Sequence, residues 1–377
     1  MKRKVLFLIE SLAGGGAEKV LTTLVQHIDK EKFDVTVCAI SGGGKYENDI
    51  KQAVKYHSIL ESPELCRGMN KLWYLIKHHL IYQWLPMSWV YRLFVPKGND
   101  VEIAFVEGFA TKLMAASCNK HAKKIAWVHC DLLHNHWTRK IYCKNAEEIC
   151  YSRFNSVITM SKTQQESLSQ LFSLHTIKVC YNPVDTDAIQ KLSSEKIQHF
   201  EKQSLCLRIV SIGRFTEVKA YDRLLRVIHR LKTEDRRCEL WLLGDGTDRN
   251  KLEAYISENN LSDDVTLWGF QSNPYKYLRQ CDLFVCSSIS EGFSTAVTEA
   301  LILGLPVVST EVSGIREQLT NGCGIITENN EEALYLGIRQ VIDHPEQLVQ
   351  MRQKALERGK DFSLSRLMSE IEAVLQN

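Results

Sequence analysis

Residues 291–310 read EGFSTAVTEALILGLPVVST, and the apolar run DLFVCSS immediately precedes them at residues 282–288. The apolar run predicts a buried strand, after which Ser294 or Thr295 can cap a helix that contains Glu299. Pro306–Ser309 then predicts the next strand. A strand, a helix and a second strand in this order indicate a parallel sheet that is buried on both faces.

The same alternation of short apolar runs and helix-length stretches fills the rest of the chain. A first series of predicted strands comprises Val5–Ile9, Val35–Ile40, Val101–Val106, Ile125–Val128, Val157–Met160 and Ile177–Tyr181. A second series comprises Arg208–Ile212, Leu240–Leu243, Val265–Trp268, Leu283–Cys286 and Pro306–Ser309. Each series begins with its own glycine-rich turn, at Gly14–Gly16 and at Gly213. The chain is therefore expected to be an α/β protein of two Rossmann-like domains, whose parallel sheets face each other across a cleft.

The polar run SSEKIQHFEKQS separates the two series of strands. We expect an N-terminal domain over residues 1–190, a linker over 191–205 and a C-terminal domain over 206–359. The last helix, within 360–377, is expected to pack back on the N-terminal domain. Ligands of such sheets bind at the carboxyl ends of the strands, which would place them between the domains.

Composition narrows the function and the location. The chain has 377 residues, a net charge of +2 and twelve cysteines without a C-x-x-C pair. The small net charge argues against a nucleic-acid partner, and scattered cysteines are typical of reduced thiols in a cytoplasm. The start, MKRKVLFLIE, has too short an apolar run for a signal peptide, and no run of 18 apolar residues is present. We expect a cytoplasmic protein.

Two carboxylates eight positions apart flank the predicted helix start, Glu291 before it and Glu299 within it. Such a pair can accept hydrogen bonds from hydroxyl groups, one from a hexose and one from a ribose. Backbone N–H groups at a helix start suit a phosphate or a sugar oxygen. The alternative is a pair of solvated surface glutamates.

Two further segments have the composition of phosphate-binding loops. In SIGRFTEVKAYDRLL, residues 211–225, Arg214 and Lys219 are spaced to reach one diphosphate, unless they are simply two solvated cations. In SLAGGGAEKVLTTL, residues 11–24, a glycine turn joins the first strand to the first helix. Lys19 replaces the third glycine of G-x-G-x-x-G, and the second strand ends CAIS without an acidic residue, which argues against a nicotinamide enzyme.

The segment from Glu291 to Glu299 resembles the E-x7-E motif of glycosyltransferase family 4, whose members are retaining enzymes of the GT-B fold. The resemblance extends over nearly the whole chain and is clearest between Arg208 and Glu317. It implies that Glu291 contacts the transferred sugar and Glu299 the nucleotide ribose, with Ser294 and Thr295 near the diphosphate. Ser294 stands where the family often has proline.

The other loops are similar to further elements of that family. Arg214 and Lys219 match its G-R-x4-K-G element, which implies diphosphate binding, although Ala220 replaces the last glycine. Gly15 and Gly16 match its amino-terminal GG-x-E loop, which faces the diphosphate and the acceptor.

Three smaller features complete the site that the resemblance implies. His129 ends WVH, where the family has a histidine that contacts the donor sugar, although a lone histidine after a strand is more often structural. Gly269 and Phe270 follow a strand and are candidates for the base pocket. The D-x-D tripeptide at 185–187 spells a metal motif of another glycosyltransferase fold, and its place at the domain boundary makes it incidental.

The resemblance implies a retaining transferase for a hexose or N-acetylhexosamine, with a UDP- or GDP-linked donor as co-substrate and no metal or other cofactor. The expected acceptor is a glycan or a lipid-linked glycan of cell-surface polysaccharide biosynthesis. The alternatives are a non-catalytic GT-B-like partner subunit of another transferase, which the intact motifs disfavour, and a GT-B sugar-nucleotide epimerase. The sequence names neither the donor sugar nor the acceptor.

One segment, residues 65–99, indicates peripheral contact with the inner face of the plasma membrane. It contains no acidic residue, and its longest uncharged run, Leu80–Tyr91, is too short to span a bilayer. Tryptophan and tyrosine favour the headgroup level, and cations favour anionic lipid. The alternative is that its rings pack in the domain core or line an acceptor groove. Its cations and its aromatic rings are Arg67, Lys71, Lys77, Arg92, Lys97, Trp73, Trp84, Trp89, Tyr74, Tyr82 and Tyr91.

Overall fold

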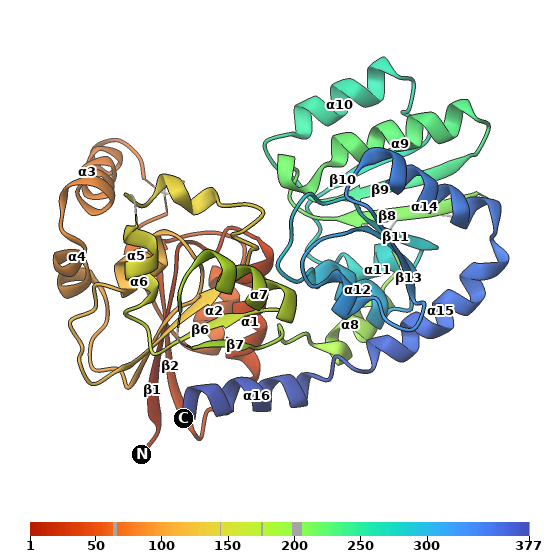
Figure 1. The fold of residues 1–377 in the computed structure, drawn as a ribbon. Helices are drawn as coiled ribbons and strands as arrows, with labels where there is room; N and C mark the ends of the chain where they lie inside the picture. Colours follow the sequence, from red (N-terminus) through yellow and green to blue (C-terminus); the bar gives the residue numbers. More distant parts are fainter. Residues whose placement is uncertain (63–65, 144, 175, 198–205, 377) are drawn as a thin grey trace. The chain divides into compact units, whose positions relative to one another are not determined.

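The structure is a computed structural model that describes residues 1–62, 66–143, 145–174, 176–197 and 206–376. The chain forms two compact units, of which unit 1 comprises Met1–Pro183 with the residues from Ser365 onward, and unit 2 comprises Val184–Leu364 (Figure 1). Each unit contains one sheet of parallel strands with helices against it. The predicted α/β class with two parallel sheets is confirmed.

The sheet of unit 1 has seven strands in the order β3-β2-β1-β4-β5-β6-β7. Its strands are β1 (Arg3–Ile9), β2 (Phe33–Ser41), β3 (Lys55–Leu60), β4 (Val101–Ala104), β5 (Lys123–Val128), β6 (Ser156–Thr159) and β7 (Ile177–Val179). Its helices are α1 (Gly16–His27), α2 (Glu47–Ala53), α3 (Met69–His79), the π-helix η1 (Leu80–Trp84), α4 (Met87–Phe94), α5 (Phe109–Met114), the 3-10 helix η2 (Trp137–Lys140), α6 (Ala146–Tyr151), α7 (Lys162–Leu171) and α16 (Leu364–Gln376).

The sheet of unit 2 has six strands in the order β10-β9-β8-β11-β12-β13. Its strands are β8 (Leu207–Ile212), β9 (Cys238–Leu243), β10 (Val265–Gly269), β11 (Leu283–Cys286), β12 (Val307–Thr310) and β13 (Gly324–Thr327). Its helices are α8 (Thr186–Ser193), the 3-10 helix η3 (Glu217–Lys219), α9 (Tyr221–Thr233), α10 (Arg249–Glu258), α11 (Tyr275–Leu278), α12 (Thr295–Ile302), α13 (Ile315–Gln318), α14 (Glu331–Asp343) and α15 (Glu346–Gly359).

Both sheets reverse their strand order once. In each, the first strand of the series lies in the middle, the next two strands extend to one side, and the fourth strand returns to the other side. The reversal falls between β1 and β4 in unit 1 and between β8 and β11 in unit 2. Crossovers on opposite faces diverge at such a switch point and leave a crevice at the carboxyl ends of the strands, where ligands of doubly wound sheets bind.

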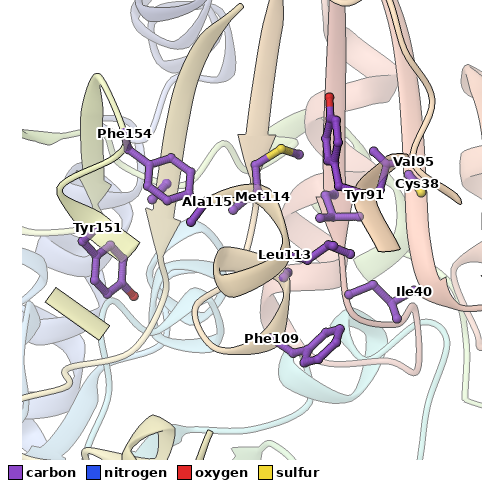
Figure 2. Packing of buried hydrophobic residues seen from close by; sticks show 14 of the residues in the cluster. Cys38, Ile40, Tyr91, Val95, Phe109, Leu113, Met114, Ala115, Tyr151 and Phe154 are labelled. Carbon is purple, nitrogen blue, oxygen red and sulfur yellow. The ribbon is translucent and has the colours of Figure 1, made fainter. Parts of the chain in front are cut away.

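The core of unit 1 explains why its strands are apolar along their length. The residues of β1 from Val5 to Ile9 are buried, as expected for a central strand that is covered on both faces. Figure 2 shows part of one layer, in which Ile40 of β2 lies with Phe109 and Leu113 of α5. Burial of one side chain of this size contributes about 1.5–3 kcal/mol, so many such contacts together order the sheet.

All predicted strands are present, but two observed strands were not predicted. β3, with the sequence KYHSIL, buries only its last two residues, because it lies at the edge of the sheet. β13, with the sequence GIIT, has only four residues and is also an edge strand. Neither gives an apolar run long enough to recognise.

The ends of unit 1 differ from the expected boundaries in one respect. The contacts divide the chain after Pro183 rather than after residue 190, because α8 packs on α11 and α12 of unit 2. Residues 198–205 of the expected linker 191–205 lie outside the described residues. At the other end of the chain α16 packs on unit 1, where Lys123 Nζ donates to Val374 O at 2.7 Å and Asp29 N donates to Glu372 Oε1 at 3.0 Å.

Candidate functional site

Lys219 and Glu291 form an ion pair at the switch point of the unit 2 sheet. Lys219 ends η3, which follows β8, and Glu291 lies in the loop that follows β11. Lys219 Nζ lies 2.5 Å from Glu291 Oε1, and the two side chains are 24% and 13% exposed. Because β8 and β11 are neighbours, the fold brings together a cation and a carboxylate that the sequence places 72 positions apart.

Two serines fix the geometry of this pair. Ser288 Oγ donates to Glu291 Oε1 at 2.6 Å, so the same carboxylate oxygen accepts from the lysine and from the hydroxyl. Ser287 Oγ donates to the backbone carbonyl of Lys219 at 2.8 Å, and Ile289 N donates to Val218 O at 2.8 Å. These bonds tie the loop after β8 to the loop after β11, so that both loops are held in one arrangement.

Lys219 is a permanent cation in this setting. Burial lowers the pKa of its ammonium group, but the charge of Glu291 has the opposite effect, and the pKa ends above its ordinary value. Burial also raises the pKa of the neighbouring Tyr221 to about 12, so that phenol stays neutral. Gly213 makes room for both, because a Cβ there would lie 2.7 Å from Tyr221 Oη and 3.1 Å from Lys219 Cε.

Ala220, which stands where the family has glycine, adopts a left-handed backbone with φ 49° and ψ 44°. It joins η3, which ends at Lys219, to α9. An L-residue in this conformation costs roughly 1–2 kcal/mol, whereas glycine adopts it freely. Ala220 therefore holds this loop in the left-handed conformation at a small cost in stability.

The start of α12 is held by side-chain bonds. Of the two predicted caps, Ser294 is the N-cap, and its Oγ accepts from Val297 N at 3.5 Å, while Thr295 is the first helical residue. Gln318 Nε2 donates to Ser294 O at 2.7 Å and to Thr298 Oγ1 at 2.8 Å, which fixes the entry into the helix.

Glu299 lies one turn into α12 and is 3% exposed. Tyr275 Oη donates to Glu299 Oε1 at 3.4 Å. Glu291 is also largely buried, so the alternative of two solvated surface glutamates is wrong for both residues. Buried carboxylates are retained where they have partners, and both of these have protein partners.

The remaining candidates of unit 2 lie at the ends of β8 and β10, the two strands that flank β9. Arg214 is exposed in the loop after β8, Gly269 ends β10 with φ 68°, and Phe270 follows it with an exposed ring. Sequence reasoning missed Gly244 and Gly246, which follow β9. A Cβ on Gly244 would lie 1.9 Å from Gly213 O, and one on Gly246 would lie 2.3 Å from Phe215 O. The signal was present, because GDG directly follows the predicted strand Leu240–Leu243.

In unit 1, Gly15 and Gly16 begin α1 at the carboxyl end of β1. Gly15 is the N-cap with an extended backbone, and among the described residues no side chain caps the helix. The first backbone N–H groups of a helix lack partners within the helix, so this start can bind an anion.

His129 follows β5 and is the one predicted residue with an orphaned polar atom. Its Nε2 is buried and has no hydrogen-bond partner among the described residues. A separate hydrogen bond joins the ring to the backbone of Phe105. Burial lowers the pKa of the ring to about 4, so His129 is neutral at pH 7. The backbone N–H of His129 donates to the buried Glu107 at 2.9 Å, a carboxylate that the sequence did not single out. A buried acceptor nitrogen is suited to a ligand hydroxyl.

The D-x-D tripeptide has a structural use at its first residue. Asp185 is the N-cap of α8, and its Oδ1 accepts from Ala188 N at 2.9 Å. In the part of the chain that the structure describes, no three His, Cys, Asp or Glu side chains are grouped to hold a metal ion.

Comparison with known proteins agrees with the fold and shows the family. The family model described as Glycosyltransferase Family 4 matches residues 14–188, and that of Glycosyl transferases group 1 matches residues 193–358. A Campylobacter jejuni protein is 29% identical over 96% of both chains, and its name is N-acetylgalactosamine-N,N'-diacetylbacillosaminyl-diphospho-undecaprenol 4-alpha-N-acetylgalactosaminyltransferase. The lipopolysaccharide 1,6-galactosyltransferase of Escherichia coli is 25% identical over 82% of this chain and 80% of its own.

Solved structures of other proteins have the same fold. The Anabaena protein HepE, in a complex with UDP and glucose, matches with a TM-score of 0.77 and 19% identity over the whole of both chains. A sucrose-phosphate synthase from Thermosynechococcus elongatus matches with a TM-score of 0.75 and 13% identity over 100% of this chain and 98% of its own. The two family models together account for most of the chain, and the motifs at 211–225 and 291–299 fall within the second of them. The chain belongs to the glycosyltransferases of the GT-B fold, of the family 4 type.

Proposed function

We propose that this protein is a retaining glycosyltransferase that moves a hexose or N-acetylhexosamine from a UDP- or GDP-linked donor to a glycan or lipid-linked acceptor. The observation that carries the proposal is the Lys219–Glu291 pair at the switch point of unit 2. Two comparisons support it. The HepE complexes hold UDP with glucose or UDP-glucose, and the Campylobacter relative is named for transfer to a diphospho-undecaprenol glycan.

Each residue of the site has a proposed role. Lys219 and Arg214 bind the donor diphosphate together with the first amides of α12, at Ser294 and Thr295. Glu291 accepts hydrogen bonds from the transferred sugar, and Glu299 accepts them from the ribose. Gly269 and Phe270 line the base. In unit 1, taken by itself, the Nε2 of His129 is suited to accept a hydrogen bond from a sugar hydroxyl, and the α1 start at Gly15 and Gly16 is suited to bind phosphate.

The proposed reaction breaks the bond between C1 of the sugar and the diphosphate oxygen, and forms a bond from C1 to the acceptor oxygen on the same face. The acceptor proton passes to an oxygen of the departing phosphate. Lys219 acts as a fixed charge rather than as a base, because its raised pKa keeps it protonated. Its charge stabilises the negative charge that grows on the diphosphate, so the proposed reaction needs no metal ion.

The proposed setting is cell-surface polysaccharide biosynthesis at the inner, cytoplasmic face of the plasma membrane. The Escherichia coli relative is named for lipopolysaccharide, and the Campylobacter relative for a polyprenyl diphosphate glycan. A lipid-linked acceptor would require the enzyme to work close to a bilayer.

A panel of nucleotide sugars tests the proposal through thermal unfolding. A donor at 100 times its Kd should raise the free energy of unfolding by about 2.7 kcal/mol, and Lys219→Ala should lose this effect. If no nucleotide sugar or nucleoside diphosphate stabilises the wild type, the protein is a non-catalytic partner subunit instead. Conversion of the donor in the absence of any acceptor would indicate the epimerase alternative.

A further inference from the structure

Helix α3 exposes an apolar stripe that unit 1 does not cover. None of its eleven residues is buried, although the helix carries four large aliphatic side chains and Trp73. Met69, Leu72, Trp73 and Ile76 recur at the spacing of one helical face, and all four are exposed, with Trp73 at 65%. An exposed apolar stripe of this length marks an interaction surface.

The opposite side of α3 shows how the helix is held. Tyr74, His78 and Tyr82 form a row of rings, with centroids 5.9 Å and 4.5 Å apart. The ring centroid of Tyr82 lies 4.3 Å from that of Phe109 in the core, and Tyr82 Oη donates to Glu10 Oε1 at 3.1 Å. The anchored side therefore faces the core, and the apolar stripe is left on the other side.

The apolar surface continues along η1 and α4. Trp84 is 73% exposed, Trp89 is 60% exposed, and Leu93 is exposed as well. Residues 66–99, which carry these rings, contain five cations and no carboxylate, so the segment has a net positive charge. Leu65, the first residue of the segment that the sequence singled out, lies outside the described residues. The alternative is that these rings pack in the core or line an acceptor groove. Packing in the core is wrong for Trp73, Trp84 and Trp89, and right for Tyr91, which is buried.

A cavity of about 400 Å³ opens beside this surface, between the edge strand β3 and the helices α3 and α4. Leu93 lines it and is also part of the apolar surface. Its polar lining includes His57, Lys77, Arg92 and Lys97. No carboxylate lines it among the described residues, so the cavity suits an anion.

The cationic walls are held in place by the fold. Lys77 Nζ donates to Ile59 O at 2.6 Å, and Arg92 Nε donates to Cys118 Sγ at 3.1 Å. His57 Nε2 lies 3.1 Å from Phe94 O. An ammonium group has three N–H bonds and a guanidinium group has five, so these anchors leave donors for an anion.

We propose that α3, η1 and α4 dock on the surface of an anionic phospholipid bilayer, with a headgroup phosphate in the cavity beside Lys77, Arg92 and Lys97. Tryptophan and leucine enter the boundary between headgroups and acyl chains, and the cations remain at the phosphate level. A second copy of this chain fits the surface less well, because two identical cationic faces repel each other. This proposal rests on the proposed function, because it specifies how the enzyme would be held at the membrane. Its test measures binding to lipid and does not require glycosyl transfer.

The test is sedimentation with vesicles of phosphatidylcholine, with and without phosphatidylglycerol, at low and high salt. The surface variant is Trp73→Ser with Trp84→Ser, and the cavity variant is Arg92→Gln with Lys97→Gln. The matched control, Val349→Ser with Lys251→Gln, removes an exposed apolar residue and an exposed cation from unit 2. Each cation near an anionic surface contributes about fivefold in affinity, so the cavity variant should bind about 25-fold more weakly. The surface variant should bind at least tenfold more weakly, and the control should bind as the wild type does.

Several outcomes would overturn the docking. The first is a wild-type protein that stays in the supernatant with anionic vesicles at low salt. The second is wild-type binding to neutral vesicles that equals its binding to anionic ones. The third is a cavity variant that binds anionic vesicles as well as the wild type does. Loss of a dimer in the surface variant, measured by sedimentation velocity without lipid, would assign the surface to self-association. Donor-induced stabilisation of the same variants separates the two proposals, because it should be unchanged even where vesicle binding is lost.

Discussion

Replacing Lys219 by alanine should slow glycosyl transfer far more than it destabilises the fold. The ammonium group lies at the switch point, 2.5 Å from Glu291, and in the proposed reaction it faces the charge that develops on the leaving diphosphate. Loss of one preorganised contact of this kind raises the barrier by about 2.7–4 kcal/mol, so kcat should fall on the order of a hundredfold or more.

The effect on stability separates a binding role from a structural one. Without Lys219, the largely buried carboxylate of Glu291 keeps its bond from Ser288 but loses its counter-ion, which should lower the free energy of unfolding by about 1–3 kcal/mol. The double variant Lys219→Met with Glu291→Gln removes both charges and should recover part of this loss. Its transfer rate should stay at the level of the worse single variant.

The assay measures the initial rate of sugar transfer with each purified variant, next to its urea unfolding curve. Lys251→Ala, which removes an exposed cation of α10, is the matched control and should behave as the wild type does. Transfer by Lys219→Ala at the wild-type rate would refute the assignment of the phosphate site. A double variant that regains transfer together with stability would show that the pair is only structural.

Three further predictions concern the backbone, the protonation and the metal dependence of the site. Ala220→Gly should raise the free energy of unfolding by up to about 1 kcal/mol, measured with urea, because glycine relieves the left-handed strain; a loss of stability would contradict this. The ring of His129 should titrate near pH 4 by NMR. The pKa of this ring is lower in the folded state than the ordinary 6.5, so its contribution to the free energy of unfolding is fully present above pH 6.5. That contribution, up to about 3 kcal/mol, is lost as the pH falls toward 4. A titration midpoint near 6.5 would refute the burial of the ring. Transfer should survive a strong chelator, and loss with EDTA that manganese or magnesium restores would overturn the metal-free reaction.

The sequence was most informative where a buried strand leads into a capped helix. The run DLFVCSS and the residues after it predict β11, a cap at Ser294 or Thr295, and the helix that carries Glu299. The strand and the helix are confirmed, and Ser294 is the cap. This works because central strands of a parallel sheet are apolar throughout, while caps require particular side chains next to them. The strands β3 and β13 lack that signal, because β3 buries only its last two residues and β13 has only four residues, of which one is buried.

The contacts of the site could not be predicted from the sequence in the same way. Lys219 and Glu291 meet because β8 lies beside β11, which depends on the order of strands in the sheet rather than on any local pattern. The close packing of Gly244 against Gly213 likewise depends on β9 lying beside β8. The aromatic residues at 73–91 show the same limit, because composition alone did not distinguish the exposed Trp84 from the buried Tyr91.

The anomeric configuration of the product tests the proposed reaction most directly. Proton NMR can follow the anomeric signals while the purified protein, the stabilising nucleotide sugar and an acceptor react without added metal. The account predicts a product whose new glycosidic bond has the same anomeric configuration as the donor, at a rate that Lys219→Ala and Glu291→Gln reduce on the order of a hundredfold. A product of inverted configuration, or the same product rate from both variants, would contradict it.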